Sequence, residues 1–454
     1  MEFDFDLIIA GADCAGSTIA KLVGEAGYSI LLIDEKDEKV LGRPWHDAVF
    51  PYVFELMGIK PFGKERAAAQ TKIFSPNQKI SGVVVGGKDY LISRKELSAK
   101  LIDSIKKMDN IIFKDNTEVI RPILKNKSVI GVEIKEMGEL KQYKSNITVD
   151  ASGFKSILRK QMPTESGIDS NDVEDFELCV ATKQIRRRTV EDVVGESVWG
   201  VYGGGLWVNN DRPGISEVGL RSRGNLVLNR EEILKNFSKS RQYISDEIIT
   251  EGTERVPMRR SFDQLVSNGF MLVGVSACQS DAMSGMGVSA SILAGSLAAK
   301  TIIKAIENKQ YDIPTLWSYQ ADYIREKGSE YAGLDVMRKY FQFITEEEFD
   351  FLFEKEIITF EVIEYLGGKK GATAEISFRD LLLKFMKGFV YKPGLMNRIR
   401  KALTQGEKMR KIYSKFPEEY DKELFDKWKF KVNNLLNKVK QVCSKFNNRI
   451  KSIT

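Results

Sequence analysis

The hydrophobic and polar positions at the start of the chain predict a βαβ unit. Residues 7–10 form a short apolar run of strand type, and a glycine-containing turn follows at once. Helical spacing then runs from about residue 15 to 25, and a second apolar run at 29–33 ends in Asp34. Apolar runs that alternate with a helical pattern are typical of parallel strands joined by a crossover helix. We therefore expect a parallel sheet that begins within ten residues of the start of the sequence.

The pattern changes in the middle of the chain. A pair of strands joined at Gly86 and Gly87 is expected over residues 83–92, and between about residues 177 and 220 the apolar positions recur with period two. Period two predicts an antiparallel sheet with one buried face, rather than another βαβ unit. A strand at 270–273 then leads into a small-residue helix at about 285–306, and beyond residue 312 the chain is largely helical and charged. We expect a boundary near residue 310.

Composition excludes several classes of protein and site. The chain has 454 residues, of which 43% are hydrophobic and 29% charged, as in ordinary globular proteins. Its single histidine, His46, excludes a multi-histidine zinc site and a histidine cluster for pH sensing. The four cysteines are far apart in sequence and form no CxxC pair, so we expect neither a metal site nor a disulfide framework. A reducing cytosol fits best.

Charge is distributed unevenly along the chain. The net charge is +6, but residues 381–454 contain 19 basic and 6 acidic residues and carry +13, which leaves −7 for the first 380 residues. Trp428, Leu435 and Val439 recur at near-helical spacing among lysines in this basic segment. Such a helix can lie against an anionic membrane, or it can cap the body with a solvated basic face. No nucleic-acid-binding motif accompanies the charge, so we expect no nucleic-acid partner.

The sequence also bears on where the protein resides. Acidic residues at the start stand where a signal peptide carries positive charge, so secretion is not expected. The long uncharged run at 282–299 is interrupted by four serines and three glycines, which predicts a buried helix instead of a membrane span. We expect a cytoplasmic protein. One role for the basic segment is peripheral contact with the cytoplasmic face of the membrane.

The turn after the first strand carries the first candidate chemistry. Gly11 and Gly16 bracket the position of a GxGxxG dinucleotide loop, and Asp34 stands where an acid accepts from a ribose hydroxyl. The middle glycine is replaced by Asp13. Two unit charges about 4 Å apart at an effective dielectric near 20 repel by about 4 kcal/mol, close to a thousandfold in affinity if nothing compensates. A strand-turn-helix that binds nothing is the alternative.

Several further segments resemble the geranylgeranyl reductase family, the FAD enzymes that include archaeal digeranylgeranylglycerophospholipid reductases. The segment 43–49 resembles the family's loop with a Pro-Cys-Gly-Asp-Ala core, and 149–154 resembles its Asp-Ala-Ser/Thr-Gly segment. Arg94 opens a helix as the family's FAD-contacting arginine does, and the segment 274–291 follows the family's flavin loop. The similarity covers roughly the first 310 residues well and the rest loosely.

The resemblance implies an α/β (α+β) fold with a Rossmann-like FAD-binding domain of the p-hydroxybenzoate hydroxylase type. That domain would be discontinuous, over residues 1–175 and 253–310, with an antiparallel-sheet substrate domain at 176–252 and a helical, basic C-terminal region at 311–454. The residues expected to bind FAD are Gly11, Ala15, Gly16, Asp34, Trp45, His46, Ala48, Arg94, Val119, Gly274, Val275, Gly285, Gly287 and Val288.

Departures from the family pattern cluster around the flavin. Val275 replaces an aspartate that holds the ribityl chain, Ala282 replaces a proline, and Trp45 and His46 replace a cysteine and a glycine. Of the family's substrate motif only Trp207 is kept, as either a substrate platform or a core residue. His46 has two interpretations: a catalytic group that supplies the proton to the reduced alkene, or a loop histidine satisfied by a backbone carbonyl.

The function implied by the resemblance is FAD-dependent reduction of carbon-carbon double bonds in geranylgeranyl chains of isoprenoid membrane lipids or their precursors, with electrons from an external donor. One alternative is a flavin-deficient lipid-binding or regulatory paralogue of the same fold. Another is a different flavoprotein reaction, such as hydroxylation. The altered contacts at Asp13, Trp45, Val275 and Ala282 leave open, at this point, whether FAD is still bound.

Overall fold

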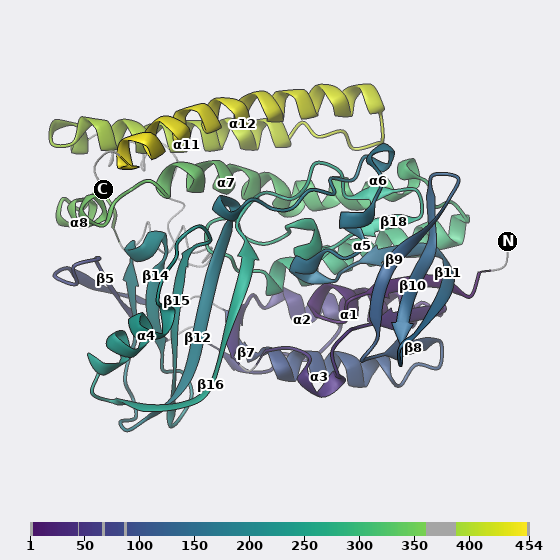
Figure 1. The fold of residues 1–454 in the computed structure, drawn as a ribbon, viewed down its shortest axis with the longest axis horizontal. Helices are drawn as coiled ribbons and strands as arrows, with labels where there is room; N and C mark the ends of the chain where they lie inside the picture. The colour runs from purple at the N-terminus through teal and green to yellow at the C-terminus, as the bar shows by residue number, and fades with distance from the viewer. Residues whose placement is uncertain (1–2, 44, 66–68, 86–88, 360–386, 452–454) are drawn as a thin grey trace.

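A mostly parallel sheet forms the centre of the N-terminal half (Figure 1). The computed structural model describes residues 3–43, 45–65, 69–85, 89–359 and 387–451. The sheet has the order β17-β18-β11-β1-β2-β8, and β10 and β9 extend it from β11 by antiparallel pairing. The predicted βαβ unit is confirmed, because β1 pairs in parallel with β2 across α1. The elements are β1 (Phe5–Ala10), α1 (Cys14–Glu25), β2 (Ile30–Ile33), β8 (Ile111–Lys114), β9 (Glu118–Lys125), β10 (Ser128–Glu136), β11 (Glu139–Asp150), β17 (Val266–Ser267) and β18 (Phe270–Leu272).

Helix α5 (Val288–Asn308) lies against α1 and is buried, as the sequence predicts. The two helices approach closely at Gly295, where an added Cβ would lie 2.8 Å from the carbonyl oxygen of Ala15. Among the helices in the described part of the chain, α5 is the one whose length and composition would allow it to cross a bilayer, and most of it is buried inside the fold. Helices α2 (Tyr52–Met57) and α3 (Arg94–Ile105) pack near the same end of the sheet.

A second sheet of seven strands stands beside the first, in the order β16-β12-β15-β14-β13-β5-β6. Its pairing is antiparallel except between β13 and β5, so the period-two prediction is confirmed. Helix α4 (Arg230–Lys239) packs against β15 and β16. The strands are β5 (Gln70–Phe74), β6 (Ser81–Val85), β12 (Leu178–Arg188), β13 (Gly195–Trp199), β14 (Gly205–Asn209), β15 (Ile215–Arg223) and β16 (Ile244–Pro257). Strands β5 and β6 belong to this sheet, although they precede the interval 176–252 that was predicted for the substrate domain. The predicted domain boundaries therefore stay a prediction.

The expected strand pair around Gly86 and Gly87 is wrong. Strand β6 pairs with β5, whereas β7 (Tyr90–Ser93) pairs with β3 (His46–Val49) and β4 (Lys64–Glu65) in a separate three-stranded sheet. The two glycines themselves lie outside the described residues. Local alternation predicted both strands correctly but could not identify their partners, because β3 is more than forty positions away in the sequence.

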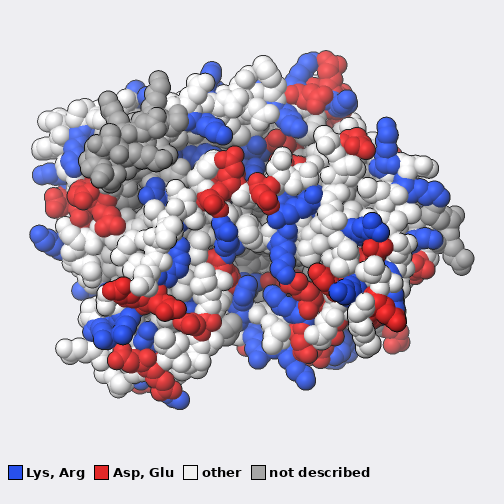
Figure 2. Space-filling model, in the orientation of Figure 1, with Lys and Arg blue, Asp and Glu red and all other residues white. Residues whose placement is uncertain are grey.

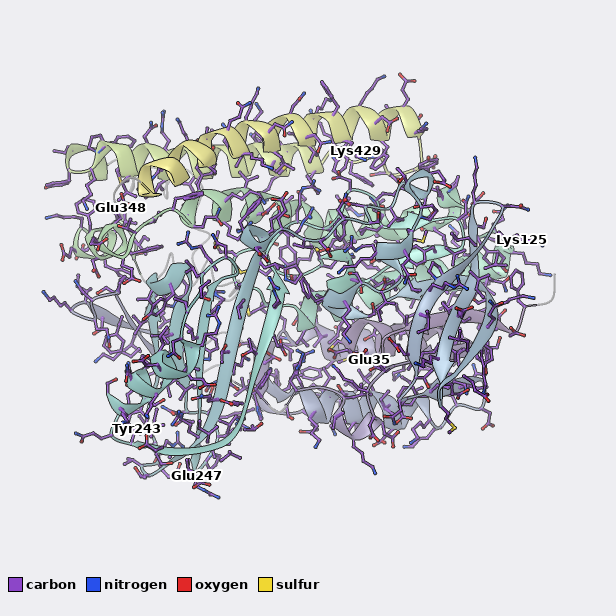
Figure 3. All side chains as sticks on the ribbon, in the orientation of Figure 1. Glu35, Lys125, Tyr243, Glu247, Glu348 and Lys429 are labelled. Carbon is purple, nitrogen blue, oxygen red and sulfur yellow. The ribbon has the colours of Figure 1, made fainter. Side chains whose placement is uncertain are left out.

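A layer of helices covers one side of the body (Figure 1). It consists of α6 (Ile313–Tyr323), a π-helical turn at 324–328, α7 (Ser329–Phe341), α8 (Glu346–Glu354), α11 (Pro393–Tyr413) and α12 (Lys422–Lys451). The apolar side chains predicted on the last helix face inward: Trp428 is 3% exposed and packs against Phe416 and Tyr413. Lys429 lies on this outermost helix (Figure 3).

Buried charges join the helical layer to the second sheet. Asp335 of α7 is 1% exposed and pairs with Arg338 (3.1 Å) and Lys339 (2.6 Å). Lys339 also pairs with Glu177 at 2.9 Å, just before β12, and Glu177 pairs in turn with Arg259 at 3.2 Å. Burial alone would raise the pKa of Asp335, but Lys339 and Arg338 together hold it well below its usual range. The network therefore depends on an ionised Asp335.

Candidate functional site

A cavity of about 790 Å³ lies between the parallel sheet and the antiparallel sheet. Its volume falls in the range of small-molecule and cofactor sites, about 300–1,000 Å³. One end is the turn between β1 and α1, and the other is the inner face of β12, β14, β15 and β16. On the face shown in Figure 2, acidic and basic side chains are interspersed around a central hollow.

The turn between β1 and α1 is built tightly against its neighbours. Gly11 has a positive φ of 107°, and an added Cβ there would lie 2.3 Å from the carbonyl oxygen of Ala151. Asp13 caps α1 by accepting the Cys14 amide at 2.8 Å. Asp34 Oδ2 accepts the Ala12 amide at 2.8 Å, and burial raises the pKa of Asp34.

Asp13 is not an isolated charge. Its carboxylate pairs with the Arg94 guanidinium at 2.5 Å. Burial alone would raise the pKa of Asp13, but Arg94 and the Cys14 amide hold it below its usual range, so the group stays ionised and paired. The repulsion expected between Asp13 and a bound pyrophosphate is thus offset by a neighbouring cation. The sequence did not reveal this compensation, because Arg94 is 81 positions away.

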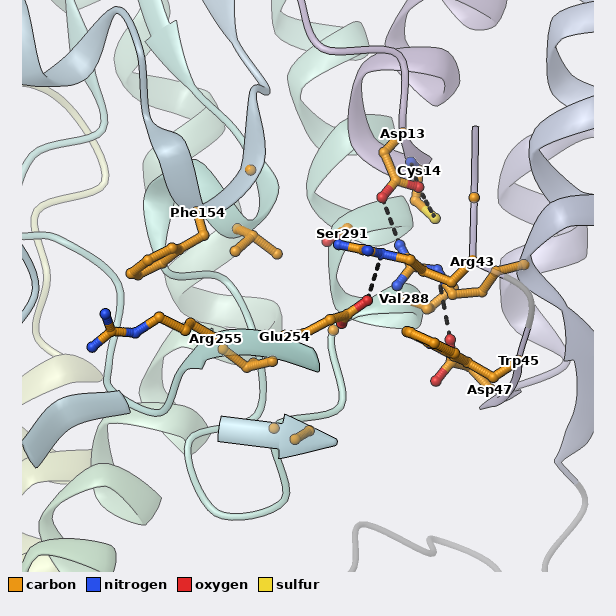
Figure 4. A pocket seen from close by; sticks show the side chains of 18 of the residues that line it. Asp13, Cys14, Arg43, Trp45, Asp47, Phe154, Glu254, Arg255, Val288 and Ser291 are labelled. Carbon is orange, nitrogen blue, oxygen red and sulfur yellow. Dashed lines mark hydrogen bonds and ion pairs between the residues drawn. The ribbon is translucent and has the colours of Figure 1, made fainter. Parts of the chain in front are cut away.

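Further ion pairs cross the cavity from Arg94 to the second sheet. Arg94 lies 3.5 Å from Asp47, which lies 3.6 Å from Lys183, and Lys183 lies 3.5 Å from Glu217. Separately, Arg43 pairs with Glu254 of β16 at 2.5 Å (Figure 4). No sequence motif indicated the ion pairs formed by Asp47, Lys183, Glu217 and Glu254. One signal in the sequence could have indicated them. Lys183 is a charged residue at a position of a period-two strand where an apolar, inward-facing residue is expected.

Most of the predicted site residues line this one cavity. They are Gly11, Ala15, Asp34, Trp45, His46, Ala48, Arg94, Val119, Val275, Gly285, Gly287, Val288 and Trp207. Two others lie behind its wall. An added Cβ at Gly16 would lie 1.9 Å from the Gly11 carbonyl oxygen, and one at Gly274 would lie 2.9 Å from the Ala15 Cβ. Both glycines permit close packing under the turn; direct contact with FAD stays a prediction for every residue named.

Trp207 lies flat on the second sheet. An added Cβ at Gly219, its partner on β15, would lie 2.0 Å from Trp207 Cζ2, so the indole covers the glycine backbone. The ring is half-buried and lines the cavity. This position suits a platform for an apolar ligand, because the half-buried ring faces the cavity.

His46 is a neutral imidazole at physiological pH. Burial and the nearby Arg212 lower the pKa of His46 to about 4, and its amide donates to Glu217 Oε2 at 3.2 Å. Its Nδ1 is buried with no hydrogen-bond partner among the described residues. One interpretation of the sequence was a loop histidine that bonds to a backbone carbonyl, and no such carbonyl bonds to Nδ1 among these residues. A neutral imidazole is a weak proton donor. Catalysis by His46 stays a prediction.

The lowered pKa of His46 predicts how the activity of a His46 variant depends on pH. Once an activity is assayed, we expect His46→Gln to leave the pH dependence of the reaction rate unchanged between about pH 6 and pH 8. An imidazole with a pKa of about 4 does not titrate in that range. Rate profiles of the two proteins over that range provide the measurement. An ionisation near pH 6.5 that disappears in the variant would contradict the expectation.

The cavity residues fit FAD. The turn at Gly11 and the start of α1 can meet a pyrophosphate because the charge of Asp13 is paired, and Asp34 and Val119 line the cavity beyond them. Val275, Trp45 and Ala48 also line the cavity, and Trp45 packs against Gly252 of the second sheet. Among the described residues, no group of His, Cys, Asp and Glu could hold a metal ion.

Known proteins of similar sequence extend over nearly the whole chain. No protein-family model matches. A digeranylgeranylglycerophospholipid reductase of Sulfolobus acidocaldarius is 24% identical over 455 residues, covering 96% of this chain and 98% of the relative. Digeranylgeranylglycerophospholipid reductase 1 of Methanococcoides burtonii is 24% identical and covers 78% of this chain and 87% of its own length.

Solved structures share the fold. A geranylgeranyl bacteriochlorophyll reductase-like protein from Thermoplasma acidophilum has a TM-score of 0.72 at 18% identity, covering 88% of this chain and 99% of its own. A flavin-dependent brominase has a TM-score of 0.61 at 15% identity, with coverages of 86% and 99%. The predicted α/β fold of the flavoprotein type is confirmed, and so is the chain's resemblance to the geranylgeranyl reductases.

Proposed function

We propose that this protein reduces carbon-carbon double bonds in geranylgeranyl chains of isoprenoid membrane lipids or their precursors, with FAD as cofactor. The observation that carries the proposal is a cavity that joins the β1–α1 turn to the Trp207 face of the second sheet. A dinucleotide at the turn and an apolar chain on the sheet could therefore meet in the same cavity. The reductase names of the relatives support the same chemistry.

The roles of the residues follow from their positions. The Gly11 turn and the start of α1 would hold the pyrophosphate, Asp34 the ribose, and Arg94 would keep Asp13 from repelling the phosphates. When bound and reduced, FAD would supply a hydride from its N5 atom for one alkene carbon, and a proton would have to reach the other carbon to complete the reduction. Trp207 would hold the chain, and the walls of the cavity would exclude water around the reacting carbons.

The proposal is tested first by cofactor binding and then by product mass. We expect purified protein to bind FAD, with a shifted flavin absorbance band and a higher melting temperature. With chemically reduced FAD, we expect a geranylgeranyl lipid to gain two hydrogens per double bond without oxygen. Absence of flavin binding would contradict the proposal and favour a lipid-binding paralogue. A product formed only in the presence of oxygen would favour hydroxylation.

We also infer that any contact with a membrane uses the lysines of the helical layer. The apolar stripe of α12 is not available for insertion, because Trp428, Leu435 and Val439 are each at most 3% exposed and belong to the core. Lys427, Lys431 and Lys438 are exposed beside this stripe. Lysines near an anionic surface contribute about 1 kcal/mol each. Membrane contact, the external electron donor and a cytoplasmic location stay predictions.

A further inference from the structure

Trp45 rests on a glycine of the second sheet. Its side chain lines the cavity but is only 3% exposed. An added Cβ at Gly252 of β16 would lie 2.6 Å from Trp45 Cη2 and 2.9 Å from Cζ3. Since real Cβ atoms do not approach so closely, the edge of the indole occupies the space that any other residue at 252 would fill. Trp45 therefore stands between the cavity and the backbone of β16.

Trp45 and Trp207 occupy equivalent places on either side of Lys183. In the sheet register Lys183 of β12 is opposite Gly252 on β16 and opposite Gly219 on β15. Trp45 covers the first glycine and Trp207 covers the second. The two indoles differ in exposure, because Trp207 is half-buried and Trp45 is almost completely buried. Trp207 thus offers surface to a ligand, whereas Trp45 closes off the space above Gly252.

Nearby cations hold the Trp45 ring in place. The Arg43 guanidinium lies 5.8 Å from the ring centroid and the Lys183 ammonium 5.4 Å from it, both within range of cation–π attraction. Each cation is itself fixed, Arg43 by Glu254 and Lys183 by Asp47 and Glu217. The indole is therefore a rigid wall rather than a mobile side chain.

We propose that Trp45 determines how far an isoprenoid chain extends toward β16, and so which chain lengths the cavity accepts. The inference rests on the proposed function and names a specificity-determining residue for it. Removing the indole would open a recess bounded by the backbone of Gly252, with room for about one further isoprene unit. A change of one methylene in a hydrophobic pocket is typically worth about tenfold or more in discrimination.

The experiment measures binding and does not require turnover. Farnesol, geranylgeraniol and geranylfarnesol, which increase by one isoprene unit each, are titrated into the full-length protein by calorimetry. We expect Trp45→Ala to shift the preference toward the next longer alcohol by at least about tenfold, and Trp45→Phe to shift it less. In the double variant Trp45→Ala with Gly252→Val, the valine fills the recess from behind, so the original preference should return.

The outcomes separate the two proposals. If the unmodified protein binds none of the three alcohols, the proposed substrate class and this inference are both overturned. If it binds them and Trp45→Ala keeps the same preference, only the role of Trp45 is overturned. A shift that Gly252→Val does not reverse also overturns it, because a general loosening of the cavity would give that result. Circular dichroism of each variant checks that the fold is retained.

Discussion

Replacing Arg94 with alanine is expected to weaken FAD binding about a thousandfold. Without the guanidinium, the Asp13 carboxylate at the start of α1 has lost its 2.5 Å partner and faces a bound pyrophosphate unpaired. Like charges about 4 Å apart at an effective dielectric near 20 repel by about 4 kcal/mol, and 1.4 kcal/mol corresponds to a factor of ten. Quenching of flavin fluorescence on titration with protein measures the affinity.

A second substitution tells how Arg94 acts. Adding Asp13→Asn to Arg94→Ala removes the unpaired charge and keeps a residue that caps helices well. If Arg94 acts by neutralising Asp13, the double variant should recover most of the lost affinity. If Arg94 instead binds the cofactor directly, as the family resemblance implies, Asp13→Asn will not restore binding. Asp13→Asn alone should change the affinity far less than Arg94→Ala.

Replacing Asp335 with alanine is expected to lower the free energy of unfolding by about 3–5 kcal/mol, the usual cost of removing one partner from a buried ion pair. Arg338 and Lys339 would remain buried without the Asp335 carboxylate, and Lys339 would keep only its pair with Glu177. Denaturant titration followed by circular dichroism provides the measurement. Glu423→Ala is the matched control, because Glu423 and Lys427 form a pair of the same helical spacing on the exposed surface of α12. Exposed pairs contribute about 1 kcal/mol at most.

The effect of Asp335 also has a pH dependence of definite sign. Its pKa is lowered in the folded protein, so its stabilising contribution is fully present above the unfolded value near 4 and is lost as the pH falls through the folded value. The stability difference between the unmodified protein and Asp335→Ala should be constant from about pH 6 to 8 and shrink below about pH 4. A difference no larger than that of Glu423→Ala would show that the network is not stabilising.

The sequence predicted the elements of the fold better than their partners. Period two located the antiparallel sheet, and the apolar run before Gly11 located β1, because these patterns are local. The pairing of β7 with β3 was missed, since strand partners are set by tertiary packing. At the site, Gly11, Asp34 and Trp207 were found from motifs, and all three line the cavity.

The electrostatics of the site could not be predicted in the same way. Taken alone, Asp13 indicates a loop that binds phosphate poorly. Only the fold brings Arg94 beside Asp13. Likewise, Lys183 and Glu217 are opposite charges on two strands whose register no motif records. Charge compensation between residues far apart in sequence is a property of the folded chain, so a single substitution in a motif is weak evidence that a cofactor site has been lost.

The burial of α12 bears on how the protein is made. Trp317 in α6 stacks on Phe416 and meets Phe425 edge-on, so this tryptophan is covered by residues about a hundred positions later in the chain. During synthesis at about 5–20 residues per second, that apolar surface stays uncovered for several seconds after α6 leaves the ribosome. The last helix therefore closes the core, and newly made chains should be most prone to aggregation and most dependent on chaperones in that interval.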